Sequence, residues 1–426
     1  MFLQILFYLF VIISVIDIIH LGFYLVGANY YDIWQYRRQA RAKQRSHHAL
    51  RPLVSVLIPA HNESMGIIRC LESVRCNTYR KLEIIVIDDA STDDTRKLVR
   101  DYIAKYPNRN IRLMYKQRNV GKAEALNHAL RSGVKGDLVM TLDADSVLQR
   151  SSITNAVAYF QDPAVAGVAA NVRIMDSLSM LGLLQKFEHM VGYRSKKFFS
   201  VTNTEYIVGG VASTYRRDIL KQIRFYDNDT TTEDIGLSLK VVALGNRAHR
   251  VVYASNVLAM TEGVQSFTGL MRQRYRWKLG GLQNLVKYRG LVANTDARYS
   301  RGLTFYRLPM AFFGELMLLL EPLAIGYVVY VCYLLLNPSM IIGAYMTITA
   351  YLLLNIWPDE HMNAAKKLRM SMYAPIMYFV FYLMNVVQLA AIFRCIFHYR
   401  QTLNRSQVVS HWVSPKRIGD QQVQFS

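Results

Sequence analysis

The chain has 426 residues, of which 52% are hydrophobic, and it carries a formal net charge of +21 at pH 7. This length is enough for one or two domains, and the apolar residues gather at the two ends, which indicates membrane helices rather than an oily globule. The positive charge is compatible with nucleic acid, anionic lipid or anionic small molecules as partners. The spacing of the cysteines excludes a zinc site and a disulfide framework, so we expect all four to be reduced and structural: Cys70, Cys76, Cys332 and Cys395.

The first segment, Phe2 to Val26, is mostly apolar, and its polar residues include Gln4, Asp17 and His20. About 25 residues are enough to cross a bilayer, and the segment lacks the basic start and cleavage site of a signal peptide. It therefore predicts a membrane anchor at residues 1–28, followed by a basic linker at 29–52. The positive-inside rule then places the next domain in the cytoplasm, because the linker region carries Arg37, Arg38, Arg41, Lys43, Arg45 and Arg51.

Residues 53–265 follow a different pattern, in which short apolar runs alternate with helical stretches. The runs LVSVLIP, LEIIVID, IRLMY and DLVMTLD are rich in β-branched residues and are each followed by turn-forming residues. Continuous apolar strands between helices are typical of a parallel sheet that is covered on both faces. The sequence thus predicts an α/β domain with a Rossmann-like, mostly parallel sheet. Ligands of such sheets bind at the carboxyl ends of the strands.

Acidic residues follow two of these expected strands. Asp88 and Asp89 close the second strand, where they suit either an ordinary turn or a hydrogen bond to a nucleotide base or ribose. Asp143 and Asp145 close the fourth strand in TLDADS. They form either a solvated acidic turn or part of the shell of a hard divalent ion that substrate phosphates complete.

Two expected helix starts also carry charged residues. Gly121 and Lys122 begin one helix, either with an incidental lysine or as a site for a diphosphate. In TTTEDIGLSLK, Thr230 and Glu233 form a capping-box pattern, which explains Glu233 better than Asp234. A carboxylate such as Asp234 at a helix start could serve as a general base.

The stretch QRYRW lies in residues 266–304, which we expect to form an interfacial helix region. On a helix, Gln273, Arg276 and Trp277 share one face. The structural interpretation is a helix whose arginine and tryptophan lie among lipid headgroups. The functional interpretation is that arginine binds a diphosphate through two hydrogen bonds, while an indole face suits a sugar ring.

Apolar runs after this stretch predict three membrane helices within residues 305–398. They lie at about Leu308–Leu336, Met340–Trp357 and Met372–Phe397. Together with the anchor, they would place the basic tail, residues 399–426, outside the cell, against the positive-inside rule. Either one run is interfacial or re-entrant, or the tail departs from the rule. We favour the first explanation, with the first run as the unusual one, because it contains Glu315, Glu321 and Pro322.

Five of these motifs together resemble the signature of the processive family 2 glycosyltransferases, which include the cellulose, chitin, hyaluronan and poly-N-acetylglucosamine synthases. The resemblance covers Leu53 to about Leu285 and the layout of the spans. It implies a GT-A fold, a UDP-sugar donor, a divalent metal (Mg²⁺ or Mn²⁺) and an inverting mechanism. The motifs, in chain order, are P-x-x-N-E at Pro59, Asn62 and Glu63, D-D at Asp88 and Asp89, D-A-D at Asp143 and Asp145, T-E-D at Thr232, Glu233 and Asp234, and Q-x-x-R-W at Gln273, Arg276 and Trp277.

The resemblance also implies a role for each matching residue. Asp234 is the expected catalytic base, and Asp143 and Asp145 are the expected metal ligands. The expected donor contacts are Pro59, Glu63, Asp89, Lys122, Asp143 and Arg276. The expected acceptor contacts are Gly209, Gly210, Glu233, Gln273 and Trp277. His61 stands where relatives usually carry an aromatic residue, which weakens the expectation of base stacking at this position.

The expected protein is therefore a multi-pass enzyme of the cell membrane with a cytoplasmic catalytic domain. It would move a sugar, of which N-acetylglucosamine fits the motif wording best, from a UDP-sugar to the end of a growing β-linked polysaccharide and take part in its export. The alternative is a transferase that adds one sugar to a lipid-linked acceptor. The bilayer is a further expected partner, and the resemblance leaves room for an accessory membrane or export subunit. Nucleic acid is not expected, because no recognition fold is evident, and the intact acidic motifs argue against an inactive partner subunit.

Overall fold

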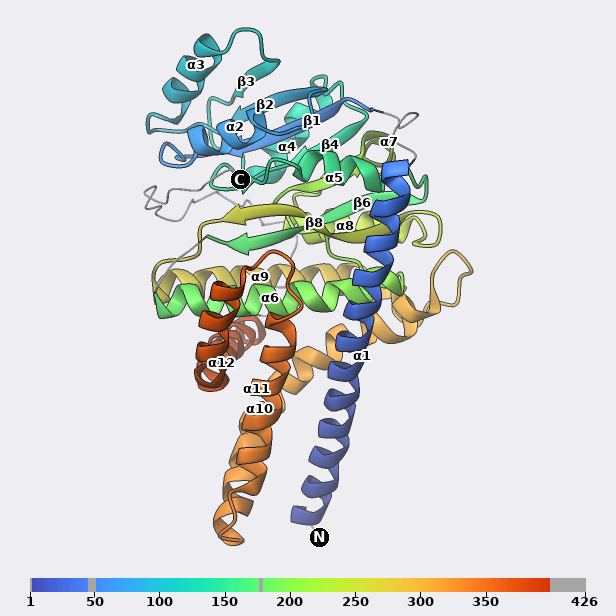
Figure 1. Ribbon diagram of the computed structural model, residues 1–426, viewed down its shortest axis with the longest axis vertical. Coiled ribbons are helices and arrows are strands. Elements are labelled where there is room, and N and C mark those ends of the chain that lie inside the picture. Colours follow the sequence, from blue (N-terminus) through green and yellow to red (C-terminus); the bar gives the residue numbers. More distant parts are fainter. Residues whose placement is uncertain (1, 45–50, 176–178, 399–426) are drawn as a thin grey trace.

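The computed structural model describes residues 2–44, 51–175 and 179–398. Figure 1 shows an α/β domain at the top, a layer of two helices beneath it, and long helices that extend away from this layer. The two helices of the layer are α6 (Met180–Val201) and α9 (Phe267–Lys287). The basic tail, residues 399–426, lies outside the described residues, as does Arg45 of the basic linker.

A mixed sheet of eight strands, in the order β3-β2-β1-β4-β7-β6-β8-β5, forms the centre of the α/β domain. The four strands expected from the sequence are confirmed, and they pair in parallel, so their carboxyl ends meet at one edge. These strands are β1 (Val54–Ala60), β2 (Leu82–Asp88), β3 (Ile111–Tyr115) and β4 (Leu138–Thr141).

Four further strands extend the sheet beyond β4. They are β5 (Val147–Leu148), β6 (Val165–Ile174), β7 (Ser213–Arg216) and β8 (Arg250–Thr261). β6 and β8 are parallel to each other, whereas β7 and β5 run antiparallel to their neighbours. The expected α/β class and mostly parallel sheet are therefore confirmed, with two antiparallel strands that the sequence did not indicate.

Helices cover both faces of the sheet, as the fully buried strand β1 requires. Alternate residues of β1 enter two different cores: Val54, Val56 and Ile58 one, and Leu57 the other. The first core also takes residues of α2 (Ile67–Arg75), α3 (Thr95–Lys105) and α5 (Ser152–Tyr159). The second takes residues of α4 (Lys122–Arg131), α7 (Arg217–Gln222) and α8 (Glu233–Ala243).

Helix α1 (Phe2–Gln44) is continuous and includes both the expected anchor and most of the expected linker. Glycine and proline are absent from this helix after Gly27, so its sequence contains no strong helix breaker there. The part near the domain buries Ala28, Tyr31 and Gln35, whereas the side chains from Gln4 to Gly27 are not buried.

Four of the described helices are long and apolar enough to cross a membrane, which agrees with the expected anchor and three later runs. After α9 come a 3₁₀ turn (Arg289–Leu291) and a π-helical turn (Gly302–Arg307). The three apolar helices α10 (Leu308–Leu334), α11 (Ser339–Ile356) and α12 (Ala364–Phe397) follow. Figure 1 shows α1, α10 and α11 extending away from the domain, whereas α12 stays beside α6 and α9.

Tyr31 joins α1 to the edge of the sheet, and its replacement tests this attachment. Its hydroxyl donates to the carbonyl of Tyr253 at 2.9 Å and accepts the backbone N–H of Ser255 at 3.1 Å. We expect Tyr31→Phe to lose about 1–3 kcal/mol, because both backbone groups lose a buried partner. The apparent Tm of the purified protein should fall by several degrees. The exposed neighbour supplies the control: Tyr30→Phe should leave Tm unchanged, and equal effects of the two changes would contradict the assignment.

Candidate active site

An ammonium group among carboxylates lies at the carboxyl edge of the parallel strands. Lys122, at the start of α4, donates to Oδ1 of Asp143 at 2.7 Å and lies 3.4 Å from Oε1 of Glu233. Burial disfavours the charged form of Lys122, but Asp143, Glu233 and Asp234 outweigh burial and raise its pKa above the ordinary value. The fold therefore gathers three acidic residues from two distant motifs around one positive charge.

Asp234, next to Glu233 in this cluster, has a pKa raised to about 6. Burial is the largest cause and the Glu233 carboxylate adds to it, whereas the Lys122 ammonium acts in the opposite direction. Oδ1 of Asp234 accepts the backbone N–H of Ile235 at 2.9 Å. A carboxylate with this pKa is ionised at neutral pH and is a stronger base than an ordinary aspartate, so it is suited to accept a proton from a hydroxyl group.

Asp143 and Asp145 are the residues that could hold a divalent cation. The side chain of Asp143 is 30% exposed, whereas Asp145 is buried and its Oδ1 accepts from the hydroxyls of Ser146 (2.8 Å) and Thr261 (3.4 Å). Within residues 2–44, 51–175 and 179–398, no group of three or more His, Cys, Asp or Glu side chains could enclose a metal ion. Two carboxylates still fit Mg²⁺ or Mn²⁺, because such ions often take one or two carboxylates and complete their shell with phosphate oxygens and water.

Asp89 lies at the carboxyl end of β2 and is fully buried. Its carboxylate accepts the backbone N–H of Val120 at 3.0 Å and that of Gly121 at 2.9 Å. Gly121 has a φ of +86°, a conformation that glycine adopts without strain. Asp89 therefore holds the turn from which Lys122 enters the site, a structural role that the sequence pattern did not indicate.

The other expected nucleotide contacts lie close to Asp89. Pro59 is inside β1, and Glu63 follows it in a turn where its backbone N–H donates to Oγ1 of Thr95 at 2.9 Å. Glu63 is only 3% exposed. Nδ1 of His61 lies 2.7 Å from the carbonyl oxygen of Asp89, so the imidazole joins the ends of β1 and β2.

The two expected acceptor glycines differ in their surroundings. A Cβ atom on Gly210 would lie 3.1 Å from Nζ of Lys122 and 3.6 Å from Oδ2 of Asp234. A Cβ atom on Gly209 would meet nothing within 4 Å. Gly210 thus lies against the charged cluster, where its missing side chain keeps the cluster accessible, and open space lies beside Gly209.

Helix α9 carries the remaining expected residues. Gln273 and Trp277 are one turn apart on the same face, which continues through Gly280 and Asn284. The indole of Trp277 is 39% exposed, Arg276 is exposed, and Oε1 of Gln273 is buried without a hydrogen-bond partner in the structure. None of these three side chains contacts Lys122 directly in the described structure. They are connected to the charged cluster through the backbone before Asp234.

Arg274 belongs to the same motif but was not singled out in the sequence. It is 3% exposed and forms an ion pair with Glu188 of α6. Its guanidinium carbon lies 4.2 Å from the centre of the Trp277 ring. The only sequence signal is the density of arginines in QRYRW, which does not show that one of them points inward. The guanidinium of Arg274 packs on the indole of Trp277, and its ion pair with Glu188 joins α9 to α6.

The segment before Asp234 packs directly against α9. A Cβ atom on Gly280 would lie 2.3 Å from Oγ1 of Thr232, so only glycine allows this approach. Nδ2 of Asn284 donates to the carbonyl of Thr232 at 3.1 Å, and Oε1 of Gln283 accepts the backbone N–H of Thr231 at 2.9 Å. The T-E-D segment therefore packs against α9 about one helical turn beyond the Q-x-x-R-W motif.

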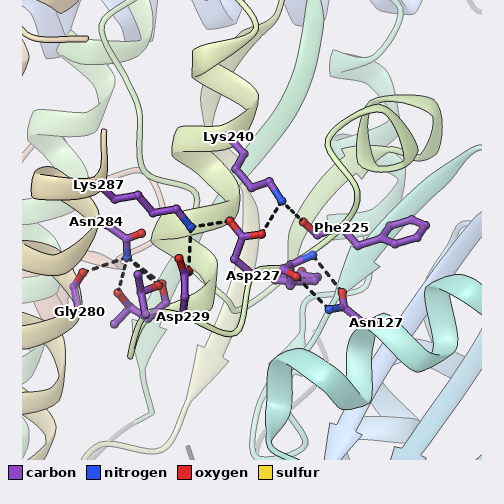
Figure 2. A network of polar contacts seen from close by, with 11 residues as sticks. Asn127, Phe225, Asp227, Asp229, Lys240, Gly280, Asn284 and Lys287 are labelled. Atoms are coloured by element: carbon purple, nitrogen blue, oxygen red, sulfur yellow. Dashed lines mark hydrogen bonds and ion pairs between the residues drawn. The ribbon is translucent and has the colours of Figure 1, made fainter. Parts of the chain in front are cut away.

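Figure 2 shows the polar network that holds the chain leading into this contact. Lys287 of α9 donates to Asp227 at 2.7 Å and to Asp229 at 2.8 Å, and Lys240 of α8 donates to the other oxygen of Asp227 at 2.7 Å. Asn127 of α4 exchanges two hydrogen bonds of 2.9 Å with the backbone of Tyr226. Residues 225–232 are thereby clamped between three helices, and none of the clamping residues was identified from the sequence.

A cavity of about 1030 Å³ lies elsewhere, between β6, β8, α6 and the turn that joins α11 to α12. Arg173, Tyr253 and Asp359 are among the residues that line it, and none of the expected site residues does so. The candidate site is therefore the charged cluster around Lys122, at the sheet edge beside β4, and not this cavity.

The chain is similar in sequence to known glycosyltransferases. Residues 55–224 match the sequence family Glycosyl transferase family 2. The chain is 32% identical over 239 residues to the poly-β-1,6-N-acetyl-D-glucosamine synthase of Staphylococcus aureus strain COL, which covers 55% of this chain and 56% of that protein. It is 29% identical over 271 residues to the synthase of the same name from Staphylococcus epidermidis. This match covers 62% of this chain and 63% of that protein. The chain thus spans a little over half the length of these curated relatives.

Among solved structures, the mannosyltransferase PcManGT of Pyrobaculum calidifontis, in complex with GDP-Man and Mn²⁺, is similar in fold. The TM-score is 0.54 at 22% sequence identity, and the similarity covers 79% of this chain and all of that one. At this level of identity, the likeness supports the GT-A-like fold alone. The sequence match, the motifs and the fold agree, and the chain therefore contains a glycosyltransferase family 2 domain that is homologous to the poly-β-1,6-N-acetyl-D-glucosamine synthases.

Proposed function

We propose that the protein is an inverting, processive glycosyltransferase that adds N-acetylglucosamine from a UDP-sugar to a growing β-linked polysaccharide. The observation that carries the proposal is the position of Asp234, a carboxylate with a raised pKa that follows Glu233 of the Lys122 cluster, at the carboxyl edge of the parallel strands. The names of the staphylococcal relatives support a polymer of N-acetylglucosamine. They also favour a polymerase over the alternative of one sugar added to a lipid-linked acceptor.

In this proposal Asp234 is the catalytic base. A sugar hydroxyl is a poor nucleophile at neutral pH, so its proton must pass to a carboxylate as its oxygen attacks the anomeric carbon. The new glycosidic C–O bond forms as the bond to the UDP oxygen breaks, and UDP leaves with the electron pair. A single displacement of this kind converts an α-linked donor into a β-linked product.

The charge that develops on UDP needs positive groups nearby. Lys122 supplies one such group from within the cluster, and Arg276, which is exposed on α9, supplies a second. Asp143 and Asp145 would hold a divalent cation, which when bound would stabilise the leaving diphosphate. We assign the uridine to the edge formed by Pro59, Glu63 and Asp89.

The acceptor end would lie between Gly209, Gly210 and the exposed face of Trp277. Stacking of a sugar ring on the indole would place the terminal hydroxyl toward Asp234, because Trp277 precedes Gly280 by one helical turn and Gly280 touches Thr232. Glu233 and Gln273 would contact the same sugar. We place the enzyme in the cell membrane with its catalytic domain in the cytoplasm, where nucleotide sugars are available.

Replacement of the base separates catalysis from binding. We expect Asp234→Asn to lower turnover by roughly two to four orders of magnitude, because the amide keeps the shape but accepts no proton. UDP affinity, measured by calorimetry, should stay within about twofold of that of the unmodified protein. Asp218 is a matched control, since its Oδ1 also accepts the N–H of the next residue at a helix start, at 2.8 Å. Asp218→Asn should be fully active, and an active Asp234→Asn would remove Asp234 from the mechanism.

The pKa of Asp234 also predicts a pH dependence. The base is active when ionised, so turnover should be high above pH 6 and should fall as the pH drops through about 6, where the carboxyl takes up a proton. Initial rates of UDP release at saturating donor measure this profile. An acidic limb near the ordinary aspartate value, about 4, would contradict the raised pKa.

Metal dependence is a separate prediction. We expect excess EDTA to abolish turnover, because two carboxylates bring no positive charge to a diphosphate. Addition of Mg²⁺ or Mn²⁺ beyond the chelator should restore the rate, and UDP release measures both steps. Full turnover in EDTA after removal of trace metal would exclude this role for Asp143 and Asp145.

The contact between α9 and the T-E-D segment gives a further test. Gly280→Ala would place a methyl group 2.3 Å from Oγ1 of Thr232 and force the two elements apart. Turnover should fall roughly 10- to 100-fold, since displacement of a reacting group by about 1 Å is this costly. Gly281 lies on the same helix with nothing within 4 Å of its Cβ position. Gly281→Ala should therefore retain activity, and a loss of equal size in both variants would refute a specific positioning role.

A further inference from the structure

We propose that α12 does not cross the membrane but lies flat on the bilayer surface next to the catalytic domain, with one face against α6 and α9 and the opposite face among lipid headgroups and acyl chains. This inference concerns membrane topology and is independent of the sugar chemistry. It also explains the basic tail, which four membrane crossings would place on the wrong side. In this proposal the third apolar run, and not the first run that we favoured from the sequence, is the one that does not cross.

The buried face of α12 contacts the domain along most of its length. Near its start, Met370 and Met377 share an apolar cluster with Phe187 of α6 and with Leu352 and Ile356 at the end of α11. In its second half, Met384 packs with Leu184 of α6 and Leu270 of α9.

The contact continues nearly to the end of the helix, where the guanidinium carbon of Arg394 lies 4.3 Å from the centre of the Tyr275 ring of α9. From Met370 to Arg394 the helix rises about 36 Å. A helix that stays beside α6 and α9 over such a distance runs along this layer rather than away from it.

The two supporting helices are themselves unsuited to cross a membrane. α6 carries charged residues such as Lys186, Glu188 and Lys197, and α9 carries the QRYRW stretch and Lys278. Charged residues within a bilayer are costly and rare. Because α12 is packed along helices that remain outside the hydrocarbon core, it is held at the level of the membrane surface.

The three other apolar helices bury fewer residues than α12 does. α10 buries only Leu308, at its start. α11 buries residues at its end, from Tyr351 to Ile356, and α1 buries none of the described side chains before Ala28. In α12, nine buried residues are distributed from Met370 to Cys395.

The opposite face of α12 is an exposed apolar stripe. Its large side chains recur every three or four residues, apart from one gap of seven filled by the exposed Ala390. They are Leu368, Met372, Ile376, Phe379, Leu383, Val386, Phe393 and Phe397. An apolar stripe of this length is not stable in water and must be covered.

A lipid surface is the occupant that the charges favour. Lys366, Lys367 and Arg369 stand at the start of α12, where they suit anionic headgroups. The start is also fixed to the domain, because Arg173 of β6 donates to both carboxylate oxygens of Asp359, at 2.7 and 3.0 Å, in the preceding turn. With only α1, α10 and α11 as spans, the chain returns to the domain side. The tail, with Arg400, Arg405, Lys416 and Arg417, then obeys the positive-inside rule.

Depth measurements along α12 test this orientation. Single nitroxide labels at Leu368→Cys, Phe379→Cys and Phe393→Cys, in full-length protein reconstituted into vesicles with anionic phospholipid, should all report the same shallow depth by oxygen and nickel-chelate relaxation. The partly buried cysteines Cys76 and Cys332 would be replaced by serine, and the buried Cys70 and Cys395 retained. Labels at Leu323→Cys, Val329→Cys and Leu334→Cys on α10 serve as controls and should differ in depth.

A deep label at position 379 between two shallow ones would show that α12 crosses the bilayer and would overturn the proposal. Labels shielded from both oxygen and the nickel chelate would show that another protein surface covers the stripe, which would also overturn it. These side chains are exposed, so the substitutions leave the core intact.

The side of the tail gives an independent readout. In intact cells, a membrane-impermeant maleimide should label Asn337→Cys in the turn between α10 and α11 but not Ser426→Cys, with Cys76 and Cys332 again replaced by serine. Permeabilised cells should show labelling of both. Labelling of Ser426→Cys from outside would contradict the proposal, whatever the enzymatic activity.

Discussion

The charged cluster around Lys122 is the constraint on which the site depends. Carboxylates that are gathered in a partly buried place repel one another, and each loses solvation, unless a cation lies among them. Lys122 provides that cation for Asp143, Glu233 and Asp234. The fold determines the position of Lys122. Asp143 follows β4, Glu233 is the first residue of α8, and α4 begins with Lys122 within reach of both carboxylates. The same balance of burial and charge leaves Asp234 as a base rather than a permanently neutral acid.

Helix α9 connects this cluster to the membrane helices. Gly280 packs on Thr232, Lys278 donates to both oxygens of Glu315 in α10 at 2.7 and 2.8 Å, and Tyr275 receives Arg394 of α12. One helix therefore links the segment before Asp234, the exposed indole of Trp277 and helices α10 and α12. The charged residues Glu315 and Glu321, which made α10 unusual in the sequence, have partners here, since Asn385 of α12 donates to Glu321 at 2.6 Å.

The sequence was most informative where the signal is local. Strands β1 to β4 are continuous apolar runs, the membrane helices follow from hydropathy, and the acidic motifs stand at strand and helix ends. β5 has only two residues, too few for a pattern. The direction of β7 depends on its pairing with β4 and β6, so these two antiparallel strands could not be predicted. Arg274, Asn284 and Lys287 act through partners far away in the chain, which no spacing reveals. Hydropathy also gives the same value for an apolar helix that crosses a membrane and for one that lies along it, so only the packing of α12 distinguishes them.

Asp89 has a structural role in addition to the nucleotide contact that its motif implies. An ionised carboxylate offers about four acceptor positions, and the N–H groups of Val120 and Gly121 already engage both oxygens of Asp89. A nucleotide could use what remains, but removal of the carboxylate would also release the turn that positions Lys122. Loss of UDP binding in an Asp89 variant would therefore not by itself identify a uridine contact. The position of Lys122 against Asp143 must be preserved before the two effects can be told apart, because the charge balance of the whole cluster depends on that contact.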